Sequence, residues 1–303
     1  MLGQEADDIA NGTRALYRGD YAEAHALASK YLDAHPDSTA ARILVARAEI
    51  AEGRYESAYE ALRQALDSEP TNIDALYYLE RVCTILSQIE FQRLIELAPD
   101  SFRSHQLAAE SYLAQHNEGE AEKEYRNALK ANPDSVEILD ALGELKRSEF
   151  RFDEALDYYE RAAKLAPGDY TSAYGSGACQ LFKQNPQRAL ESFRRAVTID
   201  HSSAAAHLAL GDALLRANQA AAASQELKAA IALVPSMRQA YALLARAYRK
   251  LGQTREAEQA LEEEQKLAQD KAKERETIPD SDDGTSPARP QPPPVEKPPD
   301  RSA

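Results

Sequence analysis

A fixed spacing of 34 residues runs through most of this 303-residue chain. Prolines 36 and 70, 99 and 133, and 133 and 167 are each separated by 34 residues, and 167 and 235 by twice that number. Among these prolines the interval from 70 to 99 is shorter, at 29 residues, and Pro186 falls outside the spacing. An alanine keeps the same rhythm at positions 24, 58, 121, 155, 189, 223 and 257. Such a period indicates a repeat architecture, in which every repeat is one supersecondary unit.

One period, residues 136–169, shows what each unit contains. Its apolar residues fall at helical spacing in two runs, with a turn predicted near 148–151. Pro167 ends the second run, because proline cannot continue a helix. The unit is therefore predicted to be helix–turn–helix. The recurring Pro-Asp-Ser at 36–38, 99–101 and 133–135 is then predicted to separate successive hairpins. The proline ends one helix, and Asp or Ser caps the next.

Composition narrows the function classes. The net charge of −14 argues against nucleic acid as the main partner, because phosphate binding needs clustered Lys and Arg. Cys83 and Cys179 are far apart, and the histidines lack metal-ligand spacing, so no metal or cofactor is expected. The stretch 174–177, Tyr-Gly-Ser-Gly, falls inside a predicted repeat helix rather than after a strand. We therefore predict that the chain is not an enzyme.

Position-specific residues within the period carry a family resemblance. When each unit is numbered so that its terminal proline is position 32, position 20 is alanine wherever the unit has that position, and position 8 is small, Glu80 excepted. Position 24 is mostly large, as in Tyr125, Tyr159 and Phe193. This pattern resembles the tetratricopeptide repeat. The resemblance implies an all-α fold, a right-handed superhelical solenoid of about eight helix–turn–helix hairpins.

The array is expected to cover residues 1–276. Its units are predicted at 5–38, 39–72, 73–101, 102–135, 136–169, 170–203, 204–237 and 238–276, the last with an extended capping helix. The third unit is five residues short, and Ser87 to Glu90 reads as a capping box, so we predict a helix break at Ser87 and a local change of twist. Residues 277–303 are rich in proline and are expected to be disordered.

The resemblance also implies where a partner would bind. In the family, the first helix of each hairpin lines a concave groove that holds a peptide or a partner's helix. The candidate protein-binding residues at those positions are Arg47, Tyr77, Arg81, Gln106, Glu110, Asp140, Glu144, Arg147 and Tyr174. Tyr and Arg are typical of binding hot spots. The acidic group formed by Glu110, Asp140 and Glu144 is expected to attract a basic partner segment.

We therefore expect a non-catalytic scaffold or adaptor that binds another protein. The alternative is a structural or self-associating subunit of an envelope or secretion assembly. The chaperone-binding carboxylate clamp of the family needs Lys and Asn at positions 5 and 9 of one unit, and no unit offers that pair. Binding of chaperone tails through such a clamp is therefore not predicted.

The N-terminal residues carry neither a basic start nor an apolar core, so no signal peptide is predicted. No run of about 18 apolar residues is present, so no membrane insertion is expected. A cytoplasmic location is the expectation, with a periplasmic one as the alternative if the true start lies upstream.

Overall fold

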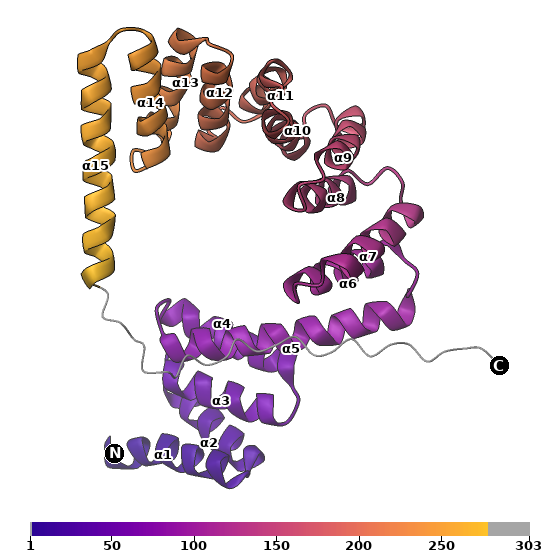
Figure 1. The fold of residues 1–303 in the computed structure, drawn as a ribbon. Helices are drawn as coiled ribbons and strands as arrows, with labels where there is room; N and C mark the ends of the chain where they lie inside the picture. The colour runs from indigo at the N-terminus through magenta and orange to yellow at the C-terminus, as the bar shows by residue number, and fades with distance from the viewer. Residues whose placement is uncertain (1, 278–303) are drawn as a thin grey trace, which may run out of the picture. The chain divides into compact units, whose positions relative to one another are not determined.

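The structure, a computed structural model, describes the backbone of residues 2–277 and the side chains of residues 9–270. Every regular element in that range is an α-helix, which confirms the predicted all-α class. Consecutive helices pack in pairs, and the chain divides into two compact units, Met1–Pro99 and the residues from Asp100 onward. The paired helices can be followed by colour in Figure 1.

The first unit contains two hairpins and one long helix. Its helices α1 and α2 pair, α3 and α4 pair, and α5 packs on α4 and α3. The bounds are α1 Leu2–Arg18, α2 Tyr21–Ala34, α3 Thr39–Ala51, α4 Tyr55–Ser68 and α5 Ile73–Leu97.

The second unit contains five hairpins in sequence. Each odd-numbered helix from α7 to α15 packs against the even-numbered helix before it, and from α8 onward neighbouring hairpins pack closely as well. The bounds are α6 Phe102–Ala114, α7 Glu118–Ala131, α8 Val136–Ser148, α9 Phe152–Leu165, α10 Tyr170–Phe182, α11 Pro186–Ile199, α12 Ala204–Arg216, α13 Ala220–Leu233, α14 Arg238–Lys250 and α15 Thr254–Thr277.

The Pro-Asp-Ser sequences mark helix starts, as predicted. The Oγ atoms of Ser38, Ser101 and Ser135 accept the backbone N–H three residues on, at 3.3, 3.1 and 3.4 Å, and so cap α3, α6 and α8. A capping side chain stabilises the helix because it satisfies an N–H group that has no partner within the helix. At His201, which stands where the other units have proline, Asp200 accepts from the backbone N–H of Ser202 at 2.9 Å, and the helix break is kept.

Each hairpin turn contains one residue with a positive backbone φ. These residues recur at the repeat spacing and are Gly19, Gly53, His116, Phe150, Gln184, Asn218 and Gly252, with φ between 58° and 83°. Only glycine adopts this conformation without steric cost, and a bulky residue there is unusual. Phe150 is the bulkiest of the set and has φ of 61°.

Small residues of the first helices receive large residues of the second helices, which is the packing that the repeat pattern predicts. A Cβ atom on Gly143 would lie 2.7 Å from the ring of Tyr159, and one on Gly177 would lie 2.6 Å from the ring of Phe193. Tyr159 is fully buried, and a Cβ atom on Gly175 of the next hairpin would overlap the same ring. Glycine at these positions lets the helices approach closely enough to enclose the aromatic ring.

The helix break predicted at Ser87 is wrong, because α5 is continuous from Ile73 to Leu97. The third unit is short by the residues that form the turn elsewhere, and it contains no counterpart of the positive-φ residue. Without such a residue the chain keeps its helical hydrogen bonds through Ser87, since a side-chain cap replaces only one of the several bonds that a break gives up.

Two further expectations concern the chain ends and the membrane. No helix within residues 2–277 is long and apolar enough to cross a bilayer. Of the predicted proline-rich tail, residues 278–303 lie outside the described part of the chain.

Candidate functional site

The predicted residues of the first unit gather with two tyrosines into what we name the arginine–tyrosine cluster, formed by Tyr17, Arg47, Tyr77, Tyr78 and Arg81. The guanidinium carbon of Arg47 lies 5.5 Å from the ring centre of Tyr17 and 5.3 Å from that of Tyr78. Arg81 donates to the hydroxyl of Tyr77 at 3.2 Å. The rings of Tyr77 and Tyr78 meet edge to face, 5.2 Å apart.

This cluster presents a surface suited to protein binding. Tyr17 is 75% exposed and Tyr77 is 53% exposed, although both are large aromatic residues. Arginine held over aromatic rings is preorganised, which lowers the entropy lost when a partner docks on it. Tyr and Arg are also the residue types that dominate measured binding hot spots.

In the second unit, side chains of α6 and α8 are joined by hydrogen bonds. The Nε2 atom of Gln106 donates to Glu110 at 3.0 Å and to Glu137 at 2.8 Å. Arg103 forms an ion pair with Glu137 at 2.9 Å. These hydrogen bonds and the ion pair lower the pKa of Glu137. Two neighbouring hairpins are therefore linked along their first helices by polar contacts.

Glu144 is held by two partners. It accepts from the hydroxyl of Tyr159 at 2.8 Å and from Nε of Arg147 at 3.0 Å. Arg147 is the main cause of the lowered pKa of Glu144. Because Tyr159 is enclosed by Gly143 and Gly175, its hydroxyl fixes Glu144 from the hairpin interior.

Asp140 lies between Glu137 and Glu144 on the same face of α8, yet it is only 9% exposed. Burial, together with the neighbouring Asp169 carboxylate, raises its pKa to about 7. Tyr174 on α10 is half-buried, stacks on Tyr170 at 5.7 Å and meets Phe193 edge-on at 5.6 Å.

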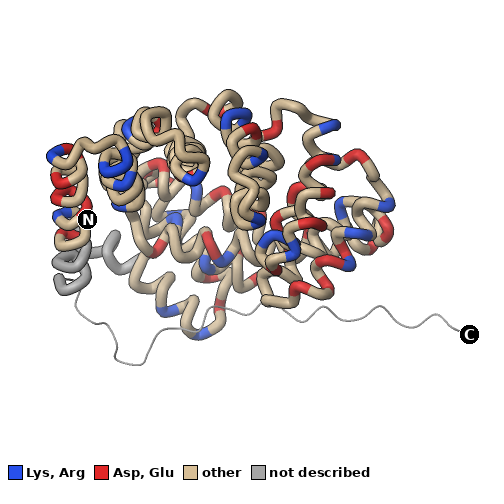
Figure 2. Tube along the Cα trace, turned by 45° about the horizontal axis from the view of Figure 1, so that its top comes forward, with Lys and Arg blue, Asp and Glu red and all other residues tan. Residues whose placement is uncertain are grey.

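We name the carboxylates of this region the acidic cluster, formed by Glu110, Glu137, Asp140, Glu144 and Asp169. Two arginines, Arg103 and Arg147, accompany the five carboxylates, so the region carries a net charge of −3 when Asp140 is ionised. Figure 2 shows acidic and basic residues interspersed along the helices. Among the described residues, no group of three or more His, Cys, Asp and Glu side chains could hold a metal ion.

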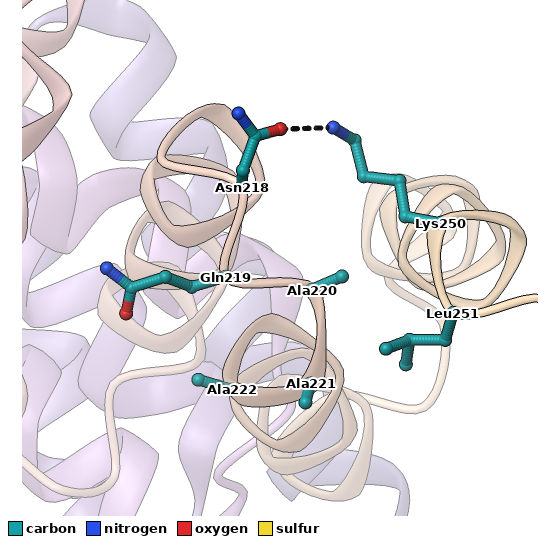
Figure 3. A pocket seen from close by; sticks show the side chains of 7 residues that line it. All are labelled: Asn218, Gln219, Ala220, Ala221, Ala222, Lys250 and Leu251. Carbon is teal, nitrogen blue, oxygen red and sulfur yellow. Dashed lines mark hydrogen bonds between the residues drawn. The ribbon is translucent and has the colours of Figure 1, made fainter.

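A separate hollow of about 580 Å³ lies at the turns of α12–α13 and α14–α15. Figure 3 shows the residues that line it, where the Nζ atom of Lys250 donates to Asn218 at 2.7 Å, and three alanines, Gln219 and Leu251 complete the lining. None of the nine candidate protein-binding residues is among the residues that line it.

Comparisons with known proteins agree with this geometry. Sequence models of the tetratricopeptide repeat match residues 15–82, 141–206 and 208–272, about two thirds of the chain. The chain belongs to the tetratricopeptide repeat family. A curated relative, sperm-associated antigen 1 of Rattus norvegicus, is 36% identical over 121 residues, a match that covers 40% of this chain and 13% of that protein.

Solved structures with the same fold include two structures of MamA and one of YrrB, which are bacterial tetratricopeptide repeat proteins. The structure of MamA has a TM-score of 0.53 at 22% identity and covers 55% of this chain and 96% of its own. MamA from Desulfovibrio magneticus RS-1 has a TM-score of 0.54 at 17% identity, and the match covers 56% of this chain and 96% of the MamA chain. YrrB, described as having an unusual peptide-binding site, has a TM-score of 0.53 at 18% identity. The match covers 58% of this chain and 91% of the YrrB chain. At these identities the likeness shows the fold alone.

Most residues predicted from the tetratricopeptide numbering lie near one another within their unit of the structure. The numbering did not point to several of the residues that contact them. Arg47, Tyr77 and Arg81 lie in one cluster, and the predicted residues of α6, α8 and α10 lie along the second unit. Tyr17 and Glu137 stand at positions 13 and 2 of their repeats, which face the groove in the family numbering, so the same numbering could have found them. Asp169 was missed because it is the N-cap of α10. A sequence pattern that explains an aspartate as a helix cap gives no sign that the same carboxylate also belongs to a binding site.

Proposed function

We propose that this tetratricopeptide repeat protein is a non-catalytic scaffold that binds a partner protein, as a peptide or helix, through the first helices of its hairpins. Tetratricopeptide repeat proteins generally mediate protein–protein interactions, and YrrB has a peptide-binding site on the same fold. The observation that carries the proposal is the arginine–tyrosine cluster, which holds large aromatic side chains in the open rather than in a core.

The two units offer different chemistry to a partner. The first unit presents cationic and aromatic groups, which suit a segment with acidic or aromatic side chains. The second unit presents mostly carboxylates, which suit a basic segment. An acidic or aromatic segment would match the first unit, and a basic segment would match the second.

A pull-down from lysate of the source cells tests the proposal, with the full chain as one bait. The second bait carries Tyr77, Arg81, Glu110 and Glu144 changed to Ala. A matched control bait changes Arg63, Glu160 and Glu191 to Ala, which are exposed residues of the second helices α4, α9 and α11. Circular dichroism shows first that all baits are folded.

We expect a partner that is held by the native chain and the control bait and is lost from the groove variant. A partner held equally by all three would place binding elsewhere on the chain and contradict the proposal. If no partner is captured, light scattering at several concentrations decides whether self-association, the alternative function, takes its place.

A further inference from the structure

The carboxyl group of Asp140 is the one polar group of the acidic cluster that is both deeply buried and unsatisfied. Residues 137, 140, 144 and 147 follow helical spacing and share one face of α8. Glu137 and Glu144 are exposed on that face, whereas Asp140 is nine-tenths buried. Its Oδ1 atom has no hydrogen-bond partner. A buried carboxylate oxygen without a donor is costly, so a donor is missing at this point.

The neighbour of Asp140 is a second carboxylate. Asp169 caps α10, and its Oδ2 atom accepts from the backbone N–H of Ser172 at 2.6 Å. Burial is the main cause of the raised pKa of Asp140, and the neighbouring carboxylate of Asp169 raises it further, so the two carboxyl groups lie close together. A pair of this kind holds a proton when no other cation is present.

The basic groups nearest the pair are engaged with other partners, and one of them, Arg195 of α11, donates from Nη2 to the Oγ atom of Ser172 at 3.4 Å. Arg103 of α6 is engaged with Glu137, and Arg147 of α8 is engaged with Glu144. Within the described residues, no ion pair joins Asp140 or Asp169 to a basic group. Glu137 and Glu144 share the face of α8 with Asp140, and the buried Lys146 of the same helix is paired with Glu122 of α7 and with Glu149.

We infer that Asp140 and Asp169 form an anchoring site for one basic side chain of the bound partner, a lysine ammonium or an arginine guanidinium. This inference rests on the proposed function and adds the chemistry of one contact to it. The incoming N–H group supplies the donor that Oδ1 lacks, and its charge takes the place of the shared proton. Two carboxylates without further ligands suit an organic cation better than a metal ion, which needs a larger ligand set.

The effect of Asp140→Asn on stability distinguishes two roles of Asp140. If Asp140 only stabilised the fold, the substitution would lower the unfolding temperature; if Asp140 serves to bind a partner, it would not. The folded state keeps a proton on Asp140 between about pH 4 and pH 7, where the unfolded state has lost it. The native chain therefore loses stability relative to the variant as pH rises through that range, and below it the two are alike. We expect the variant to unfold at a higher temperature at about pH 8, because it removes a buried charge that repels Asp169.

The binding test uses the full chain and a fluorescently labelled Lys-Gly-Ser repeat peptide, with an acetyl-lysine version as the uncharged probe. Affinity is measured by anisotropy at about pH 6 and about pH 8. With the pKa of Asp140 at about 7, the ionised fraction rises about tenfold over this range, and binding of the native chain should strengthen by a similar factor. Asp140→Asn should bind more weakly at the higher pH and lose most of the pH dependence.

Asp134→Asn is the matched control, because Asp134 is an exposed carboxylate just before α8 and its removal changes the net charge equally. It should behave like the native chain. Equal peptide binding by Asp140→Asn and the native chain overturns the inference, as does an equal loss in both variants, which would show attraction by net charge only. A lower unfolding temperature of Asp140→Asn at about pH 8 also contradicts it.

The partner assay separates this inference from the proposed function. If the groove variant loses the partner and Asp140→Asn retains it with undiminished affinity, the basic anchor is wrong and the scaffold function stands. If the groove variant also retains the partner, the proposed function fails, and the peptide titration still decides whether Asp140 and Asp169 bind a basic group.

Discussion

The third repeat, residues 73–101, forms the single helix α5, whereas the fifth repeat, residues 136–169, forms the hairpin of α8 and α9. Both carry helical apolar spacing and both end at a proline. The fifth repeat has Gly143 to receive Tyr159 and a turn with Phe150 at positive φ. The third has Glu80 at the equivalent small position and lacks the turn residues. The difference teaches that the turn, more than the helical pattern, decides whether a repeat folds back on itself.

The apolar residues of α5 form two separate faces, as the two helices of a hairpin would require. Val82 and Leu86 pack in the core of the first unit. Phe91 lies nine residues after Val82, which is a half-turn away around a helix of 100° per residue, and Leu94 and Ile95 share its side. A hairpin would use these two faces in two separate helices. In α5 they lie on opposite sides of one rod, and Phe91, Leu94 and Ile95 are half-buried rather than buried.

The largest expected effect comes from proline in the middle of α5. Gln88→Pro should lower the free energy of unfolding by about 3 kcal/mol or more, because proline removes a helical hydrogen bond and clashes with the preceding turn. If a helix began at Ser87 instead, residue 88 would be its first position, where proline is tolerated. Urea unfolding measures the difference. Glu118→Pro, at the first position of α7, is the control and should cost little.

The second prediction disturbs the close approach in the fifth repeat. Gly143→Ala places a methyl group 2.7 Å from the ring of Tyr159 and should destabilise the fold by about 1–3 kcal/mol through overpacking. Gly119→Ala is the control in the same unit, because nothing lies within 4 Å of the added methyl group. Thermal unfolding that ranks the two variants equally would show that Tyr159 can move aside.

The third and smallest effect concerns the turn of the fifth repeat. Phe150 is 74% exposed and adopts a conformation that is strained for a bulky residue. Phe150→Asn should raise stability by up to about 1 kcal/mol, since Asn tolerates the left-handed region. Phe182→Asn, at a residue that is 60% exposed within α10, controls for the removal of an exposed aromatic side chain. A loss of stability in Phe150→Asn would mean that the edge contact between Phe150 and Phe152 outweighs the strain.

Much of the fold could be predicted from the sequence because the repeat spacing averages over many units. The Pro-Asp-Ser caps and the pairing of Gly143 with Tyr159 follow from local rules that recur at every period. The continuous α5 could not be settled in this way, because the capping box at Ser87 and the absence of a turn residue point in opposite directions. Their balance depends on hydrogen bonds of the whole segment rather than on one motif.

The sequence could predict which positions contribute to the candidate site, but it could not predict how buried or how strongly perturbed their side chains are. Repeat numbering identified Asp140 and Glu144, but their difference in burial arises from the neighbouring hairpin. Asp169, which raises the pKa of Asp140, is 29 residues away in the sequence and meets it only after α8 and α10 pack. Tyr78 joins the arginine–tyrosine cluster from a position outside the groove pattern. Such contacts depend on tertiary packing, which a single sequence does not reveal.

The most direct test of the account is a distance within α5. Spin labels at Leu76→Cys and Leu97→Cys, both exposed positions, are measured by pulsed electron resonance in a chain with Cys83→Ser. A continuous helix places these residues about 32 Å apart, at 1.5 Å per residue. A hairpin broken at Ser87 would bring them to about 10 Å, the usual spacing of packed helices. The account predicts the longer distance, and a single short distance would contradict it and restore the third repeat as a complete hairpin.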